Sequence, residues 1–142
     1  MPEDELRAWK PTPERSKLMS RVRGKHTKPE ISVGRVVRRL GYRFRRHQKR
    51  LPGNPDFVFH DLSKVVFVHG CFWHRHRGCK KTTSPKTRRE FWQKKFDENV
   101  TRDRKAIRSL RRLGWSVMVV WECQTNQLSR LEGRLAKFLH SN

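Results

Sequence analysis

Residues 56–79 read DFVFHDLSKVVFVHGCFWHRHRGC, and this stretch is the most informative about the fold. Two apolar runs, 56–60 and 64–69, are joined by a short polar loop, a pattern typical of an antiparallel β-hairpin. The second run ends in His69 and leads straight into a segment with three histidines, two cysteines and two large aromatic residues within 69–79. Such residues rarely gather merely to fill a core. We therefore expect the second strand to lead into a functional site.

A third cysteine, Cys123, follows a later apolar run. If Cys123 returns to the cluster, then Cys71, Cys79, Cys123 and one histidine provide the ligands of a tetrahedral zinc site. An odd number of cysteines in a reducing compartment favours metal ligands or free thiols over disulfides. The residues alone leave open which histidine completes the site.

The apolar periodicities divide the chain into a basic arm and one domain. Residues 1–28 are rich in proline, lysine and arginine and are predicted to form an arm with at most a short helix around 16–23. Residues 29–142 are predicted to form a single α/β domain, a mixed β-sheet flanked by helices, in the order α-β-β-β-α-β-α. The predicted helices span 29–40, about 88–113 and 128–139, and the predicted strands span 42–47, 56–60, 64–69 and 116–121.

The composition limits the classes of function. A chain of 142 residues has the length of one domain, and 34% hydrophobic residues suffice for one modest core. The formal net charge of +22 exceeds what solubility requires, so nucleic acid is the expected partner, and a merely solvated basic surface is the alternative. No apolar run is long enough to span a membrane and no hydrophobic signal region opens the chain, so we expect a soluble intracellular protein.

Three acidic residues fall where the apolar pattern predicts buried side chains. Glu30 lies on the inward stripe of the first predicted helix, Asp103 fills a gap in the stripe of the long helix, and Asp56 begins an apolar strand. Each could instead pair with an arginine or lysine, or lie at an exposed end of its element. The occurrence of three such acidic residues, beside a strand that ends in His69, favours one shared polar pocket at an end of the sheet.

A pocket of this composition suits phosphodiester hydrolysis. A carboxylate and a backbone carbonyl can hold Mg²⁺, which stabilises charge that develops on the phosphodiester. An imidazole oriented by a second carboxylate can accept a proton. Pro55-Asp56 at a strand start resembles the opening of the PD-(D/E)xK nuclease pattern. The second half of that pattern is absent, because no Glu-x-Lys follows and the second strand ends in Val68-His69-Gly70.

Several motifs, in order and nearly without gaps, carry a resemblance to a known family. They are LPGNPDFV at 51–58, FVHGCFWH at 67–74, EFW at 90–92, NVTRDR at 99–104, GW at 114–115 and VWEC at 120–123. From about Ser16 to Cys123 the chain resembles the very-short-patch repair DNA mismatch endonucleases. The resemblance implies a divergent PD-(D/E)xK nuclease with a restriction-endonuclease-like fold and a structural zinc site. It also implies nicking of double-stranded DNA 5′ of the thymine in T:G mismatches left by 5-methylcytosine deamination.

The resemblance also implies roles for individual residues. The residues that match the family's active site are Asp56, His69, His74, Asp103 and Glu30. Among these, Asp56 would bind Mg²⁺ together with the main-chain oxygen of Val68, and His74 would accept a proton with Asp103 as its partner. The residues that match the zinc ligands are Cys71, His76, Cys79 and Cys123. The residues expected to contact DNA are the wedging aromatics Phe72, Trp73 and Trp92 and the arm residues Lys17, Arg21, Arg23 and Lys25.

Some features leave alternatives open. Relatives often have a run of histidines after Trp73, whereas Arg75 and Arg77 interrupt it here. Core packing is the alternative role for the three aromatics. Two alternative functions stay open. One is a non-enzymatic nucleic-acid-binding protein stabilised by zinc, and the other is a nuclease with another mismatch or duplex target. We further expect a monomer in the bacterial cytoplasm, associated with the nucleoid, with mismatch-repair proteins as candidate partners.

Overall fold

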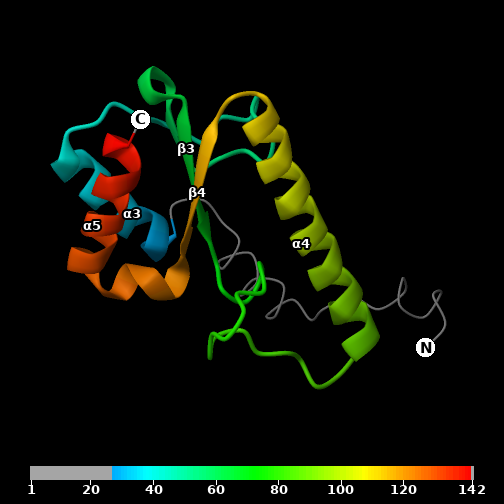
Figure 1. Ribbon diagram of the computed structural model, residues 1–142. Coiled ribbons are helices and arrows are strands. Elements are labelled where there is room, and N and C mark those ends of the chain that lie inside the picture. The colour runs from blue at the N-terminus through cyan, green and yellow to red at the C-terminus, as the bar shows by residue number, and fades with distance from the viewer. Residues whose placement is uncertain (1–26, 142) are drawn as a thin grey trace.

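The computed structural model describes residues 27–141 (Figure 1). The predicted helix around 16–23 and the four basic arm residues lie outside this range. Within it, three α-helices and four strands follow the predicted order. The helices are α3 (Lys28–Leu40), α4 (Arg89–Arg112) and α5 (Leu128–His140). The strands are β1 (Arg45–Arg46), β2 (Phe57–Phe59), β3 (Lys64–His69) and β4 (Ser116–Trp121). Two 3₁₀ turns are also present, η1 (His60–Leu62) and η2 (Glu122–Asn126).

The four strands form one mixed sheet in the order β1-β2-β3-β4, which confirms the predicted architecture. β1 pairs antiparallel with β2 and β2 with β3, and β3 pairs parallel with β4 over six residues. β3 has buried side chains on both of its faces because helices cover the sheet on both sides. The central strand therefore carries His69, its last residue, to one end of a buried sheet.

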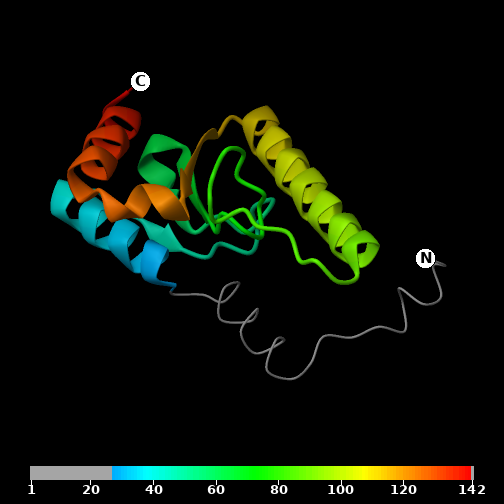
Figure 2. The same ribbon diagram turned by 90° about the horizontal axis from the view of Figure 1, so that it is seen from below.

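Two helical layers cover the sheet. α3 and α5 lie side by side on one face, and α4 crosses the other (Figures 1 and 2). Valines of α3 and leucines of α5 pack with Phe57 and Phe59 in one core, and Leu110 of α4 packs with Val58, Val65 and Phe67 in another. The sheet is thus held between two separate hydrophobic layers, and the polar residues at its end lie where both layers meet the surface.

Local signals account for most of the helix boundaries. Thr27 caps α3, its Oγ1 accepting the Glu30 N–H at 3.4 Å, and Pro29 lies in the first turn. Gly41 ends the helix in the left-handed region at φ 83°. The predicted strand at 42–47 is shorter than expected, since only residues 45–46 pair with β2. β2 likewise ends at Phe59, because residues 60–62 turn into a 3₁₀ helix. Among the described helices, none is long and apolar enough to cross a membrane.

Candidate active site

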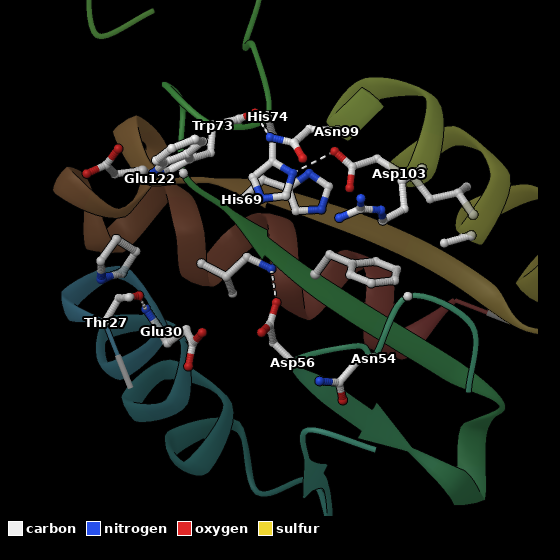
Figure 3. A pocket seen from close by; sticks show the side chains of 18 of the residues that line it. Thr27, Glu30, Asn54, Asp56, His69, Trp73, His74, Asn99, Asp103 and Glu122 are labelled. Carbon is white, nitrogen blue, oxygen red and sulfur yellow. Dashed lines mark hydrogen bonds and ion pairs between the residues drawn. The ribbon is translucent and has the colours of Figure 1, made fainter. Parts of the chain in front are cut away.

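A polar cavity of about 590 Å³ lies at the end of the sheet where β3 finishes. The start of α3, the residues before β2, the end of β3 and the middle of α4 all contribute to its lining (Figure 3). Glu30, Asp56 and Asp103 line it together with His69 and His74. The structure therefore brings together the five predicted catalytic residues, which come from four separate segments of the chain.

Glu30 is held at one side of the cavity by a basic pair that the sequence reasoning missed. Glu30 is 5% exposed, and Arg46 Nη2 donates to Glu30 Oε2 at 2.7 Å. The Arg46 guanidinium also lies 4.3 Å from the centre of the Phe57 ring. His47 Nε2 lies 3.4 Å from Glu30 Oε2, and His47 Nδ1 lies 3.8 Å from Asp56 Oδ1. No local signal in the sequence marks this pair, because the β1–β2 pairing is what sets His47 next to Asp56.

Asp56 is the acid with the most perturbed environment. Burial raises its pKa to about 7, assisted by the neighbouring Glu30 carboxylate, although the Val68 N–H that donates to Oδ2 at 2.6 Å opposes the rise. Glu30, His47 and Asp56 offer three ligand atoms within 4.8 Å of one another. Two carboxylates confined in this way fit a divalent cation, because its charge would offset both their desolvation and their mutual repulsion.

His74 and Asp103 form a second polar pair on the opposite side of the cavity. His74 Nδ1 and Asp103 Oδ2 lie 2.6 Å apart, so the carboxylate fixes the orientation of the ring (Figure 3). The His69 ring stacks on the His74 ring at 3.9 Å with an interplanar angle of 6°. Burial lowers the pKa of His69 to about 3, with a further contribution from the neighbouring His74, so His69 is neutral at physiological pH. Since Nδ1 of His74 is engaged, Nε2 is the nitrogen that can accept a proton.

Beside the cavity, Cys71, His76, Cys79 and Cys123 offer four ligand atoms within 4.8 Å of one another. The His76 Nδ1 atom lies 3.6 Å from Cys71 Sγ and 3.5 Å from Cys123 Sγ. Ligands on one tetrahedral Zn²⁺ would stand about 3.6 Å apart for a sulfur–nitrogen pair, given bonds of about 2.3 and 2.1 Å. The residues therefore fit zinc in both chemistry and spacing. His76 belongs to this group and His74 to the cavity.

The surroundings of this cysteine–histidine group hold it in shape. The Trp121 ring stacks on His76 at 4.2 Å and 7°, and the Thr82 hydroxyl donates to the carbonyl oxygens of Cys71 and His76. Glu122 accepts the Cys71 N–H at 3.3 Å. These contacts connect the loop after β3 to η2, which follows β4.

The three predicted wedging aromatics belong to one aromatic cluster, and Trp73 also lines the cavity. Trp73 and Trp92 are 4% and 3% exposed and pack with Phe96, whereas Phe72 is partly buried at the edge of this cluster. Asn99, which the sequence reasoning also missed, donates from Nδ2 to the Trp73 carbonyl at 3.4 Å. Insertion of the two indole rings into DNA would require the cluster to open, so their DNA-contacting role stays a prediction.

Taken with the basic charge, a sheet end lined by acids and an aspartate-paired histidine is suited to the hydrolysis of a phosphodiester. The model of a family described as DNA mismatch endonuclease Vsr matches residues 10–81. The chain belongs to this Vsr family, which implies a restriction-endonuclease-like fold.

Relatives of known type agree with this assignment. The chain is 46% identical over 129 residues to a type II nicking enzyme of Xanthomonas oryzae pv. oryzae, covering 90% of this chain and 94% of the relative. It is 44% identical over 109 residues to the DNA mismatch endonuclease Vsr of Escherichia coli, covering 77% and 69%. A type II nicking enzyme of Neisseria meningitidis is 38% identical, covering 90% and 91%. These findings decide between the alternatives raised by the sequence: the protein is an enzyme, a hydrolase acting on DNA, rather than a non-enzymatic binding protein.

Proposed function

We propose that this endonuclease nicks double-stranded DNA 5′ of the thymine in T:G mismatches and thereby starts very-short-patch repair. The observation that carries the proposal is the cavity itself. The His74–Asp103 pair and the buried Asp56 face one space at the end of β3. The name of the Escherichia coli relative, a DNA mismatch endonuclease, supports a mismatch as the target.

The His74–Asp103 pair supports a role in proton transfer. Hydrolysis adds water across a P–O bond, so the attacking water must lose a proton as its oxygen bonds to phosphorus. His74 Nε2 would accept that proton, and Asp103 would stabilise the resulting imidazolium through the 2.6 Å contact. The neutral His69 ring, stacked on His74, would keep the acceptor in its plane.

Asp56 and the main-chain oxygen of Val68 would hold a magnesium ion at the other side of the cavity, with Glu30 close to its waters. When bound, Mg²⁺ supplies charge stabilisation for the phosphodiester and lowers the pKa of bound water. The Val68 N–H fixes Asp56 Oδ2 at 2.6 Å, and Arg46 fixes Glu30 at 2.7 Å. Both carboxylates are thus positioned before any ligand binds.

The zinc ion that the cysteine–histidine group would hold has a structural role in this proposal. All four of its tetrahedral positions would be filled by protein, which leaves none for water or substrate. Its function would be to hold the loop with Phe72, Trp73 and His74 against the end of β4.

Recognition of the mismatch would depend on the aromatics and the arm. Phe72, Trp73 and Trp92 would enter the base stack, which costs a few kcal/mol of unstacking, less where a wobble pair already weakens the stack. Lys17, Arg21, Arg23 and Lys25 would add affinity that depends little on sequence, since their contacts are to phosphates. Mismatch-repair proteins are candidate partners, and we expect the enzyme to act as a monomer in the nucleoid.

A nuclease with a broader or different target is the second candidate, because two of the closely similar relatives are named as type II nicking enzymes rather than mismatch enzymes. A nicking assay distinguishes the two. Duplexes of one sequence would carry T:G, each other mismatch, or a normal pair, with magnesium added or withheld. We expect magnesium-dependent nicking of one strand, beside the thymine and fastest for T:G. Equal rates on the paired duplex would favour the second candidate.

A further inference from the structure

Arg75 connects three parts of the molecule and has no role in the chemistry proposed above. Its Nη1 donates to the Phe72 carbonyl at 3.2 Å and to the Thr83 carbonyl at 2.8 Å. Its Nη2 donates to Ser84 Oγ at 2.9 Å. One side chain therefore ties the turn that bears Phe72 to the segment that leads from the cysteine–histidine group into α4.

The same guanidinium packs on the aromatic cluster. Its central carbon lies 3.9 Å from the centre of the Phe96 ring, which is on α4, and 5.6 Å from the centre of the Phe72 ring. Phe72 in turn meets Trp73 and Phe96 edge to face, at 5.2 and 5.3 Å between ring centres. A planar, delocalised cation is suited to stack and to donate sideways at once, which lysine cannot do.

The backbone of Arg75 indicates that these contacts are specific. Its φ is 54°, in the left-handed region that is unfavourable for a residue other than glycine. This conformation sends the side chain back over Phe72, three residues earlier. The hydrogen bonds and the ring contact compensate for the backbone cost, so the turn and the side chain stabilise each other.

We propose that Arg75 is a positioning residue that holds Phe72 rigid for insertion into DNA, and that it thereby sets the preference for mismatched over paired duplex. The inference rests on the proposed function. Phe72 is the predicted wedging ring that is only partly buried. A ring held in place loses little conformational freedom on insertion, whereas a mobile ring would lose more and would insert less at a mismatch. Contact with ordinary duplex, which depends on charge, would not need a rigid ring.

The test compares Arg75→Ala, Arg75→Lys and the control Arg77→Ala, because Arg77 is exposed in the same loop and its loss removes the same charge. The ratio of nicking rates on T:G and paired duplexes is measured at matched zinc content, together with paired-duplex binding across a salt series. We expect Arg75→Ala to lower the ratio about three- to tenfold. Arg75→Lys should lower it nearly as much, because lysine keeps the charge but not the planar fork. Arg77→Ala should keep the ratio and weaken binding to the same extent as Arg75→Ala.

The proposal is overturned if Arg75→Ala keeps the parental ratio, or if Arg77→Ala lowers it equally, since charge alone would then explain the effect. Should Arg75→Ala fail to fold, Arg75→Lys decides by the same criterion. Iodide quenching of tryptophan fluorescence tests the positioning role of Arg75 independently of the proposed function, because it needs no DNA. If the parental enzyme shows no T:G preference, the proposed function fails, yet greater quenching in Arg75→Ala than in Arg77→Ala would still support the positioning role. Equal quenching would contradict it.

Discussion

At the scale of single residues, burial determines the chemistry of the cavity. Asp56 and Glu30 are neighbours largely shielded from solvent, and fixed donors around them, among them the Val68 N–H and Arg46, offset their charge. On the other side, burial keeps His69 neutral while Asp103 orients His74. One side of the cavity is therefore suited to bind a cation, and the other side is suited to accept a proton.

The buried carboxyl of Asp56 makes stability depend on pH in a definite direction. Its pKa is about 7 in the folded protein and 3.8 when unperturbed, so the folded state binds the extra proton between these values. Protonation of Asp56 therefore contributes to the free energy of unfolding at low pH, and this contribution is lost as pH rises from about 4 to 7. Without added magnesium, we expect Asp56→Asn to be more stable than the parent at pH 8, by about 1–3 kcal/mol, and the difference to shrink toward pH 5. Urea unfolding from pH 5 to pH 8 measures this difference in stability. Asp61→Asn, at an exposed position, is the control, and a difference that is constant with pH would contradict the assignment.

His74 and Asp103 should behave as one unit in catalysis. We expect His74→Ala and Asp103→Asn each to lower the rate of nicking by roughly 10²–10⁴-fold, the range for a positioned base and its orienting acid. The double variant should be little worse than His74→Ala, because both changes remove the same proton acceptor. Single-turnover rates on a T:G duplex give the comparison, with the exposed Asp97→Asn on the same helix as control. Additive losses would show that the two residues act separately.

At the scale of elements, a buried lysine joins the sheet to the last helix. Lys64, the first residue of β3, is 4% exposed, and its Nζ donates to the carbonyls of Phe138 and Leu139 at 2.6 and 3.2 Å and also to the Ser141 carbonyl. These carbonyls belong to the end of α5, where unpaired acceptors and the helix dipole favour a cation. The lysine therefore fixes α5 against the strand that carries His69.

Replacement of this lysine should loosen that junction. We expect Lys64→Met to destabilise the domain by about 1–3 kcal/mol, because buried carbonyl oxygens lose a charged donor. Lys137→Met, at an exposed position in the last turn of the same helix, should change stability by less than about 0.5 kcal/mol. Thermal and urea unfolding of both variants provide the measurement. Equal effects of the two substitutions would mean that the Lys64 contacts contribute nothing.

The elements also show what the sequence could and could not predict. The apolar runs of β2, β3 and β4 and the capping residues Thr27 and Gly41 are local signals, so the sheet and the helix ends were predictable. The spacing of Asp103 in α4 likewise predicted that it points inward. Arg46 and His47 were missed because their position depends on the register of a two-residue edge strand. Lys64 was missed because its acceptors lie more than seventy residues away.

At the scale of the whole molecule, the few acidic residues are concentrated at the site. The 35 lysine and arginine residues outnumber the 13 acids, yet four acids, Glu30, Asp56, Asp103 and Glu122, line the cavity at the end of β3. A basic surface would attract the DNA backbone, and an acidic cavity within it would attract a divalent cation. The loop that contains most of the cysteine–histidine group also carries Phe72, Trp73 and His74. It therefore connects two of the predicted DNA-contacting aromatics to the cavity.

Zinc should therefore support the whole domain. We expect one Zn²⁺ per chain by elemental analysis, and unfolding or loss of cooperativity when a strong chelator removes it. Cys123→Ser should lower the melting temperature markedly, because Cys123 would be the zinc ligand that ties the segment after β4 to the loop after β3. Thr125→Ser, two residues further along η2, serves as the control. A zinc-free protein with unchanged far- and near-ultraviolet circular dichroism would refute the structural role.

If the cavity at the end of β3 is the catalytic centre of a mismatch endonuclease, nicking must depend on Asp56, and the Asp56→Ala variant provides the test. The measurement is magnesium-dependent nicking of a T:G duplex under single-turnover conditions, with binding of the same duplex measured in parallel and the exposed Asp61→Ala as control. We predict that Asp56→Ala abolishes nicking but keeps near-parental, salt-sensitive binding, because phosphate contacts come from lysine and arginine. Asp61→Ala should nick at the parental rate. Nicking by Asp56→Ala at the parental rate would contradict the account.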